Sequence, residues 1–565
     1  MNNLSKSIKT ALQKAPREPF PENPLLMVAA HILTSIPVDV DELNSEQKNM
    51  LLRFIAITTY EMALQRKTSI TPSFITHAAQ VLVKNLLASN DDSLDTVEEK
   101  TMNNLYGIIQ YNSSEIDEKK EIEAKKEDRT LEQSLIAAII PQAKKQLEGG
   151  DGGSMIRAMM GVYNQIVEAC KTKEIVCHLK NLTLGDVTGK NMPIKVVDAL
   201  GYDPLGIKGR AIGLRARAYE AMLYEAGAQF DPHRYDLASL GWRGLRERFI
   251  EYGNQYGLYS MHSAQESLIG EGGSGTLLRV FMAALFSLKK EQSDKKFSAY
   301  FPNPAFRMVG DMAADAGFEV IETLTNPANG FFPDPIEVNT YLMKHPECRV
   351  FILIPIGNPN ANFPAPNKIN ELLQVLQKHE MILVNDFAYL GTGDREKNKE
   401  LALALSKYKR RVDCFSMSKI FGRTGLRCGC AVTPDEEIAK QFSPAAKHIQ
   451  LGLSYPMQQE AMALWDFVSQ EDRNVLNEYY RNQQIHLLSI LKNNKKQFIN
   501  PHLPIFDRAG LYLYVPLNEG FDVFDIMQET GYVGVPDAAF SNPALSPEGR
   551  YIRFALGVER ITLQR

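Results

Sequence analysis

Short apolar runs alternate with amphipathic segments along the chain after about residue 180. The apolar runs have strand length, and they cover residues 297–301, 318–322, 350–356, 381–385, 411–415 and 426–432. Between them, apolar residues at helical spacing predict helices at about 276–288, 307–316, 367–379 and 398–408. Strands that alternate with helices predict βαβ units and a largely parallel sheet, so the predicted fold class is α/β. Ligands of such sheets bind at the loops that leave the carboxyl ends of the strands.

The N-terminal part of the chain shows a different pattern. Residues 24–112 repeat apolar positions at helical spacing, and they predict a small all-α region. A run of mixed charge at 115–129 and a glycine-rich stretch at 149–153 then predict a linker. The predicted organisation is an N-terminal helical accessory domain (1–115), a charged, helical and glycine-rich linker (116–155), an N-terminal arm with part of a small domain (156–230), a large ligand-binding domain (231–455) and a C-terminal small domain (456–565).

Composition narrows the class of protein. The apolar share of 44% and the charged share of 23% are typical of a soluble globular protein. A net charge of −4, with an acidic balance in residues 24–112, argues against nucleic acid or an anionic membrane surface as a partner. No run of eighteen apolar residues occurs, and the polar start of the chain lacks the core of a signal peptide.

Six cysteines are scattered along the chain, and only Cys428 and Cys430 have the spacing of metal ligands. Alternation along the predicted strand places both side chains on one face, where packed free thiols are expected and not a metal site. The cysteine pattern therefore favours a reducing, cytoplasmic location and predicts no bound metal.

A glycine-rich loop at 270–276 leads into the predicted helix that begins near residue 276. Small residues such as Gly273, Ser274 and Gly275 let backbone amides approach an anion, and the helix N-terminus adds partial positive charge. The loop therefore fits a phosphate group, although a flexible turn before a helix has the same composition. It lacks the Gly-Lys-Ser/Thr of a nucleotide-binding P-loop.

Candidate site residues also follow the predicted strands. Phe306 follows the predicted strand at 297–301, and a turn that begins at Asn358 follows the strand at 350–356. Asp386 directly follows the strand at 381–385, and Tyr389 comes three residues later. Taken singly, a core ring, a turn cap and a locally paired carboxylate explain these residues equally well. An aspartate at the end of an apolar strand nevertheless needs a cationic or donor partner.

Lys419 lies between the last two predicted strands, within the stretch 416–427 and next to Ser416 and Ser418. An amine held rigidly in a dry cleft can lose its proton and attack a carbonyl, whereas an isolated Ser-x-Ser-Lys is usually a surface loop. The combined set comprises a phosphate cradle, a carboxylate, hydrogen-bond partners for a phenolic oxygen, a flat ring and an amine. Pyridoxal phosphate requires all of these groups.

Order and spacing strengthen this hypothesis. From Asn358 in the turn Asn-Pro-Asn-Ala, Asp386 follows after twenty-eight residues, Tyr389 after three more, Lys419 thirty-three after Asp386, and Arg427 eight after Lys419. Over roughly residues 180–560 the sequence resembles the class I and II aminotransferases of the fold-type I, or aspartate aminotransferase, superfamily of pyridoxal-phosphate enzymes. The resemblance implies a large domain with a mainly parallel seven-stranded sheet and an α+β small domain, here preceded by an all-α N-terminal region.

The resemblance also implies roles for individual residues. Lys419 would hold the cofactor aldehyde as an imine and later move the α-proton of the substrate. Asp386 would pair with the pyridine nitrogen, and Asn358 and Tyr389 would contact the phenolic oxygen of the ring. Phe306 would stack on the ring. The phosphate would be held by Gly273, Ser274, Gly275, Ser416 and Arg427, with Ser418 as a further candidate.

Substrate contacts follow from the same resemblance. Arg553 would bind the substrate α-carboxylate, with Arg550 as the alternative, and Gly185 would close over the substrate. Tyr235 resembles the tyrosine that reaches the phosphate of a neighbouring subunit, although its gap to the next motif is one residue longer than usual. Two residues depart from the family pattern. Ala361 replaces the glycine of the turn, and the neutral Gln450 stands where dicarboxylate-specific members have arginine, so a neutral or apolar amino donor is expected.

The predicted function is therefore transfer of an amino group between an amino acid and a 2-oxo acid, by a ping-pong mechanism in a homodimer. Other pyridoxal-phosphate chemistry, such as β-decarboxylation, racemisation or a lyase reaction, would use the same residues. A cofactor-binding sensor attached to the N-terminal domain is a more distant alternative. The N-terminal helical region could also serve assembly or docking.

Overall fold

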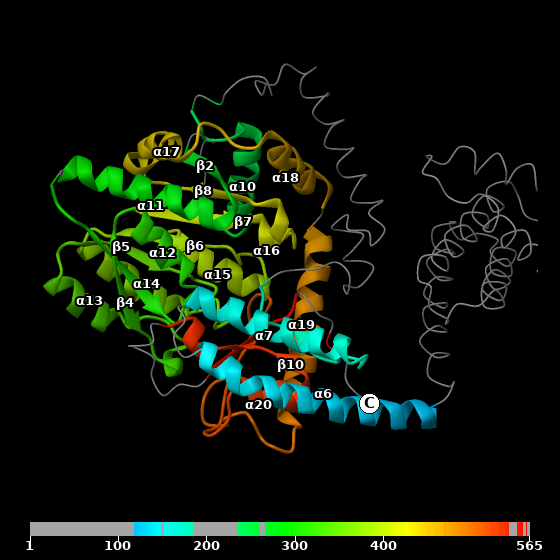
Figure 1. Cartoon of the computed structure of the whole chain (residues 1–565). Coiled ribbons are helices and arrows are strands. Elements are labelled where there is room, and N and C mark those ends of the chain that lie inside the picture. Colours follow the sequence, from blue (N-terminus) through cyan, green and yellow to red (C-terminus); the bar gives the residue numbers. More distant parts are fainter. Residues whose placement is uncertain are drawn as a thin grey trace, which may run out of the picture. The chain divides into compact units, whose positions relative to one another are not determined.

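The structure is a computed structural model, and it describes residues 118–147, 152–185, 236, 238–259, 266–292, 294–468, 470–541, 551–557 and 561 (Figure 1). The chain divides into two units, Met1–Glu127 and Asp128–Arg565, and the second unit contains both the large and the small domain. The predicted helical domain 1–115 lies outside the described residues, as do Tyr235 and Arg550.

A seven-stranded sheet forms the centre of the large domain. Its strand order is β2-β8-β7-β6-β5-β3-β4, and β8 is the one strand of the seven that runs antiparallel to its neighbours. The strands are β2 (Ser267–Glu271), β3 (Ser298–Asn303), β4 (Glu319–Leu324), β5 (Cys348–Leu353), β6 (Ile382–Asp386), β7 (Arg411–Ser416) and β8 (Cys428–Val432). The predicted α/β class with a mainly parallel seven-stranded sheet is confirmed. The sequence pattern misses only β2, because that strand is short and carries just two large apolar residues, Leu268 and Ile269.

Side chains alternate between the two faces of the sheet along each buried strand, so both faces are apolar. Helices cover both of these faces. In β5, Val350 and Ile352 pack on one face, and Phe351 and Leu353 pack on the other. The first face is covered by α11 (Gly272–Glu291), α12 (Met308–Asp315) and α17 (Glu436–Ile449). The second is covered by α10 (Arg243–Gln255), α13 (Pro335–Lys344), α14 (Pro366–Lys378), α15 (Arg395–Leu405) and α18 (Tyr455–Phe467).

The two cysteines of β8 behave as expected from this alternation. Cys428 and Cys430 are fully buried free thiols within the same apolar cluster. Ala431, the residue after Cys430, packs in the cluster on the opposite face. The two cysteines are therefore core residues of the sheet.

A second core belongs to the small domain. Its strands are β9 (Tyr512–Pro516), β11 (Val535–Pro536) and β12 (Tyr551–Ala555) in one antiparallel sheet, and β1 (Lys180–Asn181) parallel to β10 (Tyr532–Val533) in another. Its helices are α6 (Glu118–Leu147), α7 (Gly152–Thr172), α19 (Gln470–Lys492) and α20 (Val523–Thr530). Ile136 of α6 and Ile166 of α7 lie in one apolar cluster with Leu487 of α19 and Phe524 of α20, and Figure 1 shows these helices around the small sheets. Helix α6 lies within the residues expected as a helical linker (116–155), and most of α7 lies within those expected as an arm with part of the small domain (156–230).

The remaining regular elements are short. They are the four-residue helix α16 (Met417–Ile420) and the 3-10 turns Pro327–Asn329, Thr424–Leu426 and Asp537–Ala539. Among the helices of the described residues, none has the length and apolar character needed to cross a bilayer.

Candidate active site

The candidate site lies where β5, β6 and β7 end at the same edge of the sheet. Asp386 is the last residue of β6, Ser416 is the last residue of β7, and Lys419 follows in α16. Parallel neighbours bring their carboxyl ends together, so a strand-end residue on β6 and one on β7 lie near each other. The structure thus brings these three residues to one edge of the sheet.

Asp386 is a buried carboxylate, with 7% of its surface exposed. One of its oxygens accepts a hydrogen bond from the Ala388 backbone N–H at 3.1 Å. Burial raises the pKa of Asp386 from 3.8 to about 6, and the Ala388 hydrogen bond and the positive charge of Lys419 oppose this rise. A cationic hydrogen-bond donor next to the Asp386 carboxylate would therefore stabilise its charged form strongly.

Lys419 is half-buried and approaches the same space. Its Nζ donates a hydrogen bond to the backbone carbonyl of Gly185, and its charge acts on the Asp386 carboxylate. Gly185 also lies against Tyr512, because an added Cβ at position 185 would sit 2.2 Å from the Tyr512 hydroxyl. Gly185 therefore lies directly against the lysine, and position 185 has no room for a side chain.

A buried hydrogen-bond network includes Asn358, Tyr389, Tyr512 and Arg553. The Asn358 amide donates to the Tyr389 hydroxyl at 3.3 Å, and this hydroxyl is 2.9 Å from that of Tyr512. Burial and the adjacent Tyr512 hold the pKa of Tyr389 well above its usual value, so its hydroxyl remains protonated and can donate. The amide oxygen of Asn358 accepts a hydrogen bond from Arg553 Nη1 at 2.9 Å.

Arg553 lies on β12 opposite Tyr514 and is 2% exposed. Its Nη2 donates to the backbone carbonyl of Thr183, and its guanidinium carbon lies 4.7 Å from the ring centres of Tyr512 and Phe540. Burial lowers the pKa of Arg553, and its Nε has no hydrogen-bond partner among the described residues. The guanidinium is thus a buried cation whose hydrogen bonds go to uncharged oxygens, which favours an anionic ligand.

The first turn of α11 lies next to Arg427 and Ser416. Gly272 has φ +73°, and a Cβ there would lie 2.3 Å from Nη2 of Arg427. At Gly273, a Cβ would lie 3.6 Å from the Cβ of Ser416. A helix N-terminus, a guanidinium and a hydroxyl therefore meet around small residues, an arrangement suited to phosphate. Ser274 and Gly275 lie in the same turn.

The structure also describes three further predicted residues, Phe306, Ser418 and Gln450. Phe306 is half-buried and packs against the apolar cluster that contains α11, and its neighbour Ala305 donates a backbone hydrogen bond to the Phe540 carbonyl at 2.8 Å. Ser418 is buried, and its N–H donates to the Ser416 hydroxyl at 3.3 Å. Gln450 follows the end of α17 and is exposed.

Ala361, where the family has glycine, adopts φ +42° and is fully buried. Its carbonyl accepts the backbone N–H groups of Arg508 at 3.2 Å and Ala509 at 3.0 Å. The turn therefore keeps the left-handed conformation that glycine favours, and it joins the large domain to the segment that precedes β9.

Three residues of the site were not predicted, namely Thr183, Tyr512 and Phe540. Thr183 contributes only its backbone carbonyl to Arg553, which leaves no trace in the sequence. Tyr512 and Phe540 stand in apolar runs, where an aromatic residue is usually a core residue. The alternation of Tyr512 and Tyr514 along one short strand was the single signal available.

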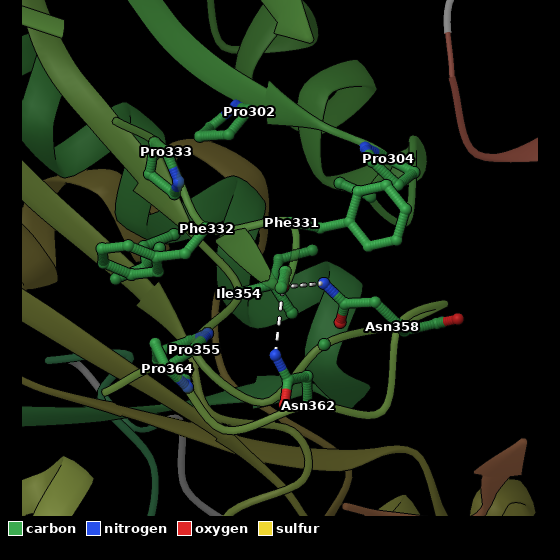
Figure 2. A pocket seen from close by; sticks show the side chains of 15 residues that line it. Pro302, Pro304, Phe331, Phe332, Pro333, Ile354, Pro355, Asn358, Asn362 and Pro364 are labelled. Carbon is green, nitrogen blue, oxygen red and sulfur yellow. Dashed lines mark hydrogen bonds between the residues drawn. The ribbon is translucent and has the colours of Figure 1, made fainter. Parts of the chain in front are cut away.

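A pocket adjoins the network at Asn358. Figure 2 shows its lining of proline and phenylalanine side chains, with amide side chains on one side. Asn360 and Asn362 donate their amides to the Gly330 carbonyl at 3.5 and 3.2 Å. The fifteen lining residues are all uncharged.

Solved structures share this fold. The chain resembles a Thermus thermophilus aspartate aminotransferase double mutant with a TM-score of 0.52 and 19% identity, covering 70% of this chain and 91% of that one. It resembles the substrate-bound BacF structure from Bacillus subtilis with a TM-score of 0.54 and 18% identity, covering 72% and 91%. The described architecture is therefore that of a fold-type I transferase.

A family model described as aminotransferase class I and II matches residues 244–541, more than half of the chain. The chain belongs to the class I and II aminotransferases, and members of this family with this fold use pyridoxal phosphate.

Among curated relatives, the chain is 23% identical to an LL-diaminopimelate aminotransferase of Maridesulfovibrio salexigens over 46% of this chain and 64% of that protein. It is 27% identical to a histidinol-phosphate aminotransferase of Dechloromonas aromatica over 42% and 56%. In each case the match spans less than two thirds of the relative.

Proposed function

We propose that this protein is a pyridoxal-phosphate-dependent aminotransferase that moves an amino group between an amino acid and a 2-oxo acid. One observation carries the proposal. The Lys419 amine, the buried Asp386 carboxylate and the first turn of α11 lie at one edge of the sheet, and the buried Arg553 guanidinium donates a hydrogen bond to Asn358 beside the end of β5.

The residues present fit the cofactor. Its phosphate would lie at the first turn of α11, next to Ser416 and Arg427. A protonated ring nitrogen would satisfy Asp386, whose raised pKa reflects a buried carboxylate short of cationic partners. Asn358 and Tyr389 offer donors for the phenolic oxygen, and Phe306 is the candidate for stacking on the ring. When bound, pyridoxal phosphate supplies an aldehyde that combines with amines and a ring that withdraws electrons from Cα.

Protein residues would perform the remaining tasks. Lys419 would hold and move the proton at the substrate Cα, which requires its amine in the neutral form. Arg553 would orient the substrate by pairing with its α-carboxylate. Thr183 and Gly185 would help to exclude water, because Gly185 contacts Lys419 and lies against Tyr512, and Thr183 contacts Arg553.

A neutral or apolar amino donor is the favoured substrate class. Gln450 carries no charge, and the pocket beside Asn358 is lined by uncharged residues. Neither feature would stabilise a second carboxylate on the donor. We also expect a homodimer with shared active sites, which sedimentation velocity measures directly, and a cytoplasmic location.

Spectroscopy tests the proposal. The purified full chain with pyridoxal phosphate is expected to absorb near the visible edge. A neutral amino acid should bleach this absorbance, and a 2-oxo acid should restore it. Lys419→Ala should remove both responses, whereas Lys407→Ala, at an exposed position, should retain them.

Three outcomes would contradict the proposal or its finer parts. Release of carbon dioxide or racemisation without amino transfer would assign other chemistry to the same residues. Binding of the cofactor with no response to any amino acid would favour a sensor. Strong preference for aspartate or glutamate over alanine and branched-chain amino acids would refute the expected donor class.

A further inference from the structure

A second cluster of reactive side chains lies in the small domain, away from the residues assigned to the cofactor. Glu132 of α6, Cys170 of α7 and Cys177 in the segment after α7 offer one carboxylate oxygen and two sulfurs, all within 4.8 Å of one another. Cys170 is fully buried and Glu132 is 5% exposed. We propose that these three residues bind a thiophilic divalent cation of the zinc class.

The geometry is close to that of a metal site. With Zn–S bonds of about 2.3 Å and Zn–O bonds of about 2.0–2.2 Å, tetrahedral ligand atoms are about 3.4–3.8 Å apart. The observed spread exceeds this by roughly one ångström at most, which side-chain rotation can close. His178 Nδ1 lies 3.1 Å from Glu132 Oε2, but His178 is not one of the three residues whose ligand atoms lie within 4.8 Å of one another, so its ring would have to move to supply a fourth ligand.

The cluster is poorly explained as ordinary core. A buried carboxylate needs partners, and the described partners of Glu132 are the backbone N–H of His178 at 2.6 Å, the His178 ring and the Cys177 thiol. Thiols are weak hydrogen-bond donors, so Cys170 and Cys177 stabilise this carboxylate little. A zinc-class cation would bind the carboxylate oxygen and both sulfurs together, because thiolate and carboxylate are both ligands of zinc.

No sequence motif marks this cluster. Cys170 and Cys177 are seven residues apart, and Glu132 precedes them on another helix, so the spacing matches no metal-binding pattern. Packing of α6 and α7 in one core brings the three side chains together. The expectation that the chain binds no metal rested on the spacing of the cysteines and on the packing expected for Cys428 and Cys430.

Position links this cluster to the active site. Cys177 stands three residues before β1, and the chain continues from β1 to Thr183 and Gly185, whose carbonyls contact Arg553 and Lys419. A cation at Cys177 would therefore fix α6 and α7 to the segment that covers the candidate substrate site. This regulatory consequence, unlike metal binding itself, rests on the proposed function.

Metal analysis of the full chain tests the proposal. The protein is expressed in zinc-supplemented medium without a histidine tag, dialysed and analysed by inductively coupled plasma mass spectrometry. About one zinc per chain is expected in the wild type and in Cys348→Ala, a buried cysteine on β5 of the large domain. Cys177→Ala and Glu132→Gln should each lose most of it.

A second measurement does not depend on the folding of variants. Wild-type protein stripped of metal and loaded with Co²⁺ should show near-ultraviolet thiolate-to-cobalt absorbance that added Zn²⁺ removes. Absence of zinc and of this absorbance would overturn the proposal. Equal zinc in wild type and both ligand variants would overturn it too. So would a thiol titration of the denatured protein that finds four free thiols of the six, because Cys170 and Cys177 would then form a disulfide.

Activity separates the two proposals. Chelation of the holoenzyme is expected to raise KM for the amino donor about five- to tenfold, with the cofactor absorbance unchanged. Zinc binding without any amino-acid response would refute the proposed function and leave the metal site standing. An active enzyme that holds no zinc would do the reverse.

Discussion

Replacing Asp386 by asparagine separates two effects of this carboxylate. Its burial lowers the folding stability of the cofactor-free protein, and its charge is expected to help bind the cofactor. Its pKa is raised from 3.8 to about 6, chiefly by burial. Because the folded-state pKa lies above the unfolded one, the penalty is absent below about pH 4 and grows until it is complete above about pH 6. The difference of about two pKa units, at about 1.36 kcal/mol each, corresponds to about 3 kcal/mol of lost stability at pH 8.

Cofactor-free Asp386→Asn protein is therefore expected to be about 3 kcal/mol more stable than wild type at pH 8, and about half as much at pH 5. The attraction between Asp386 and Lys419 is already included, since it lowers the same pKa. Urea unfolding followed by circular dichroism between pH 5 and pH 8 measures the difference.

Asp394→Asn is the matched control, because Asp394 caps α15 at the surface and asparagine caps equally well. Its difference from wild type should change little with pH. With pyridoxal phosphate present, wild type should gain more stability than Asp386→Asn, because the ring nitrogen pairs with the carboxylate. An Asp386→Asn protein that is no more stable than wild type at pH 8 would refute the reasoning.

Three further substitutions test the site. Arg553→Lys should raise KM for the amino donor about 100-fold, or about 3 kcal/mol, because one amine cannot replace the bidentate guanidinium; steady-state kinetics would contradict this with a change below threefold. Gly272→Ala should weaken pyridoxal-phosphate binding tenfold or more in an absorbance titration, because a Cβ at φ +73° would collide with Arg427. An unchanged affinity would refute phosphate binding at the first turn of α11. Tyr389→Phe should lower kcat/KM about tenfold, because Asn358 loses its hydroxyl partner; an unchanged value would exclude a role for that hydroxyl.

The strand-end residues were predictable because each one closes an apolar run. Asp386 and Ser416 follow strands that the hydrophobic pattern locates to within a residue or two, and parallel pairing then brings them together. Lys419 gained weight only from its spacing to these residues. The fold class followed from the same alternation of strands and helices.

Contacts between the two domains were beyond the pattern. Arg553 and Asn358 are 195 residues apart, and the carbonyl of Thr183 reaches the same guanidinium from a third, distant part of the chain. Backbone acceptors have no residue signature, so the sequence cannot mark them. The sequence also does not predict the packing of α6 against α7, which brings Glu132, Cys170 and Cys177 together.

The carbonyls of Thr183 and Gly185 already accept hydrogen bonds from Arg553 and Lys419, the two residues that the proposed mechanism assigns to the substrate. An arriving amino acid would thus have to exchange with the chain's own backbone, and its measured affinity would contain the cost of that exchange. The backbone at Thr183 and Gly185 would therefore compete with the substrate. This competition would disfavour a small anion that binds Arg553 but leaves the Gly185 carbonyl bound to Lys419.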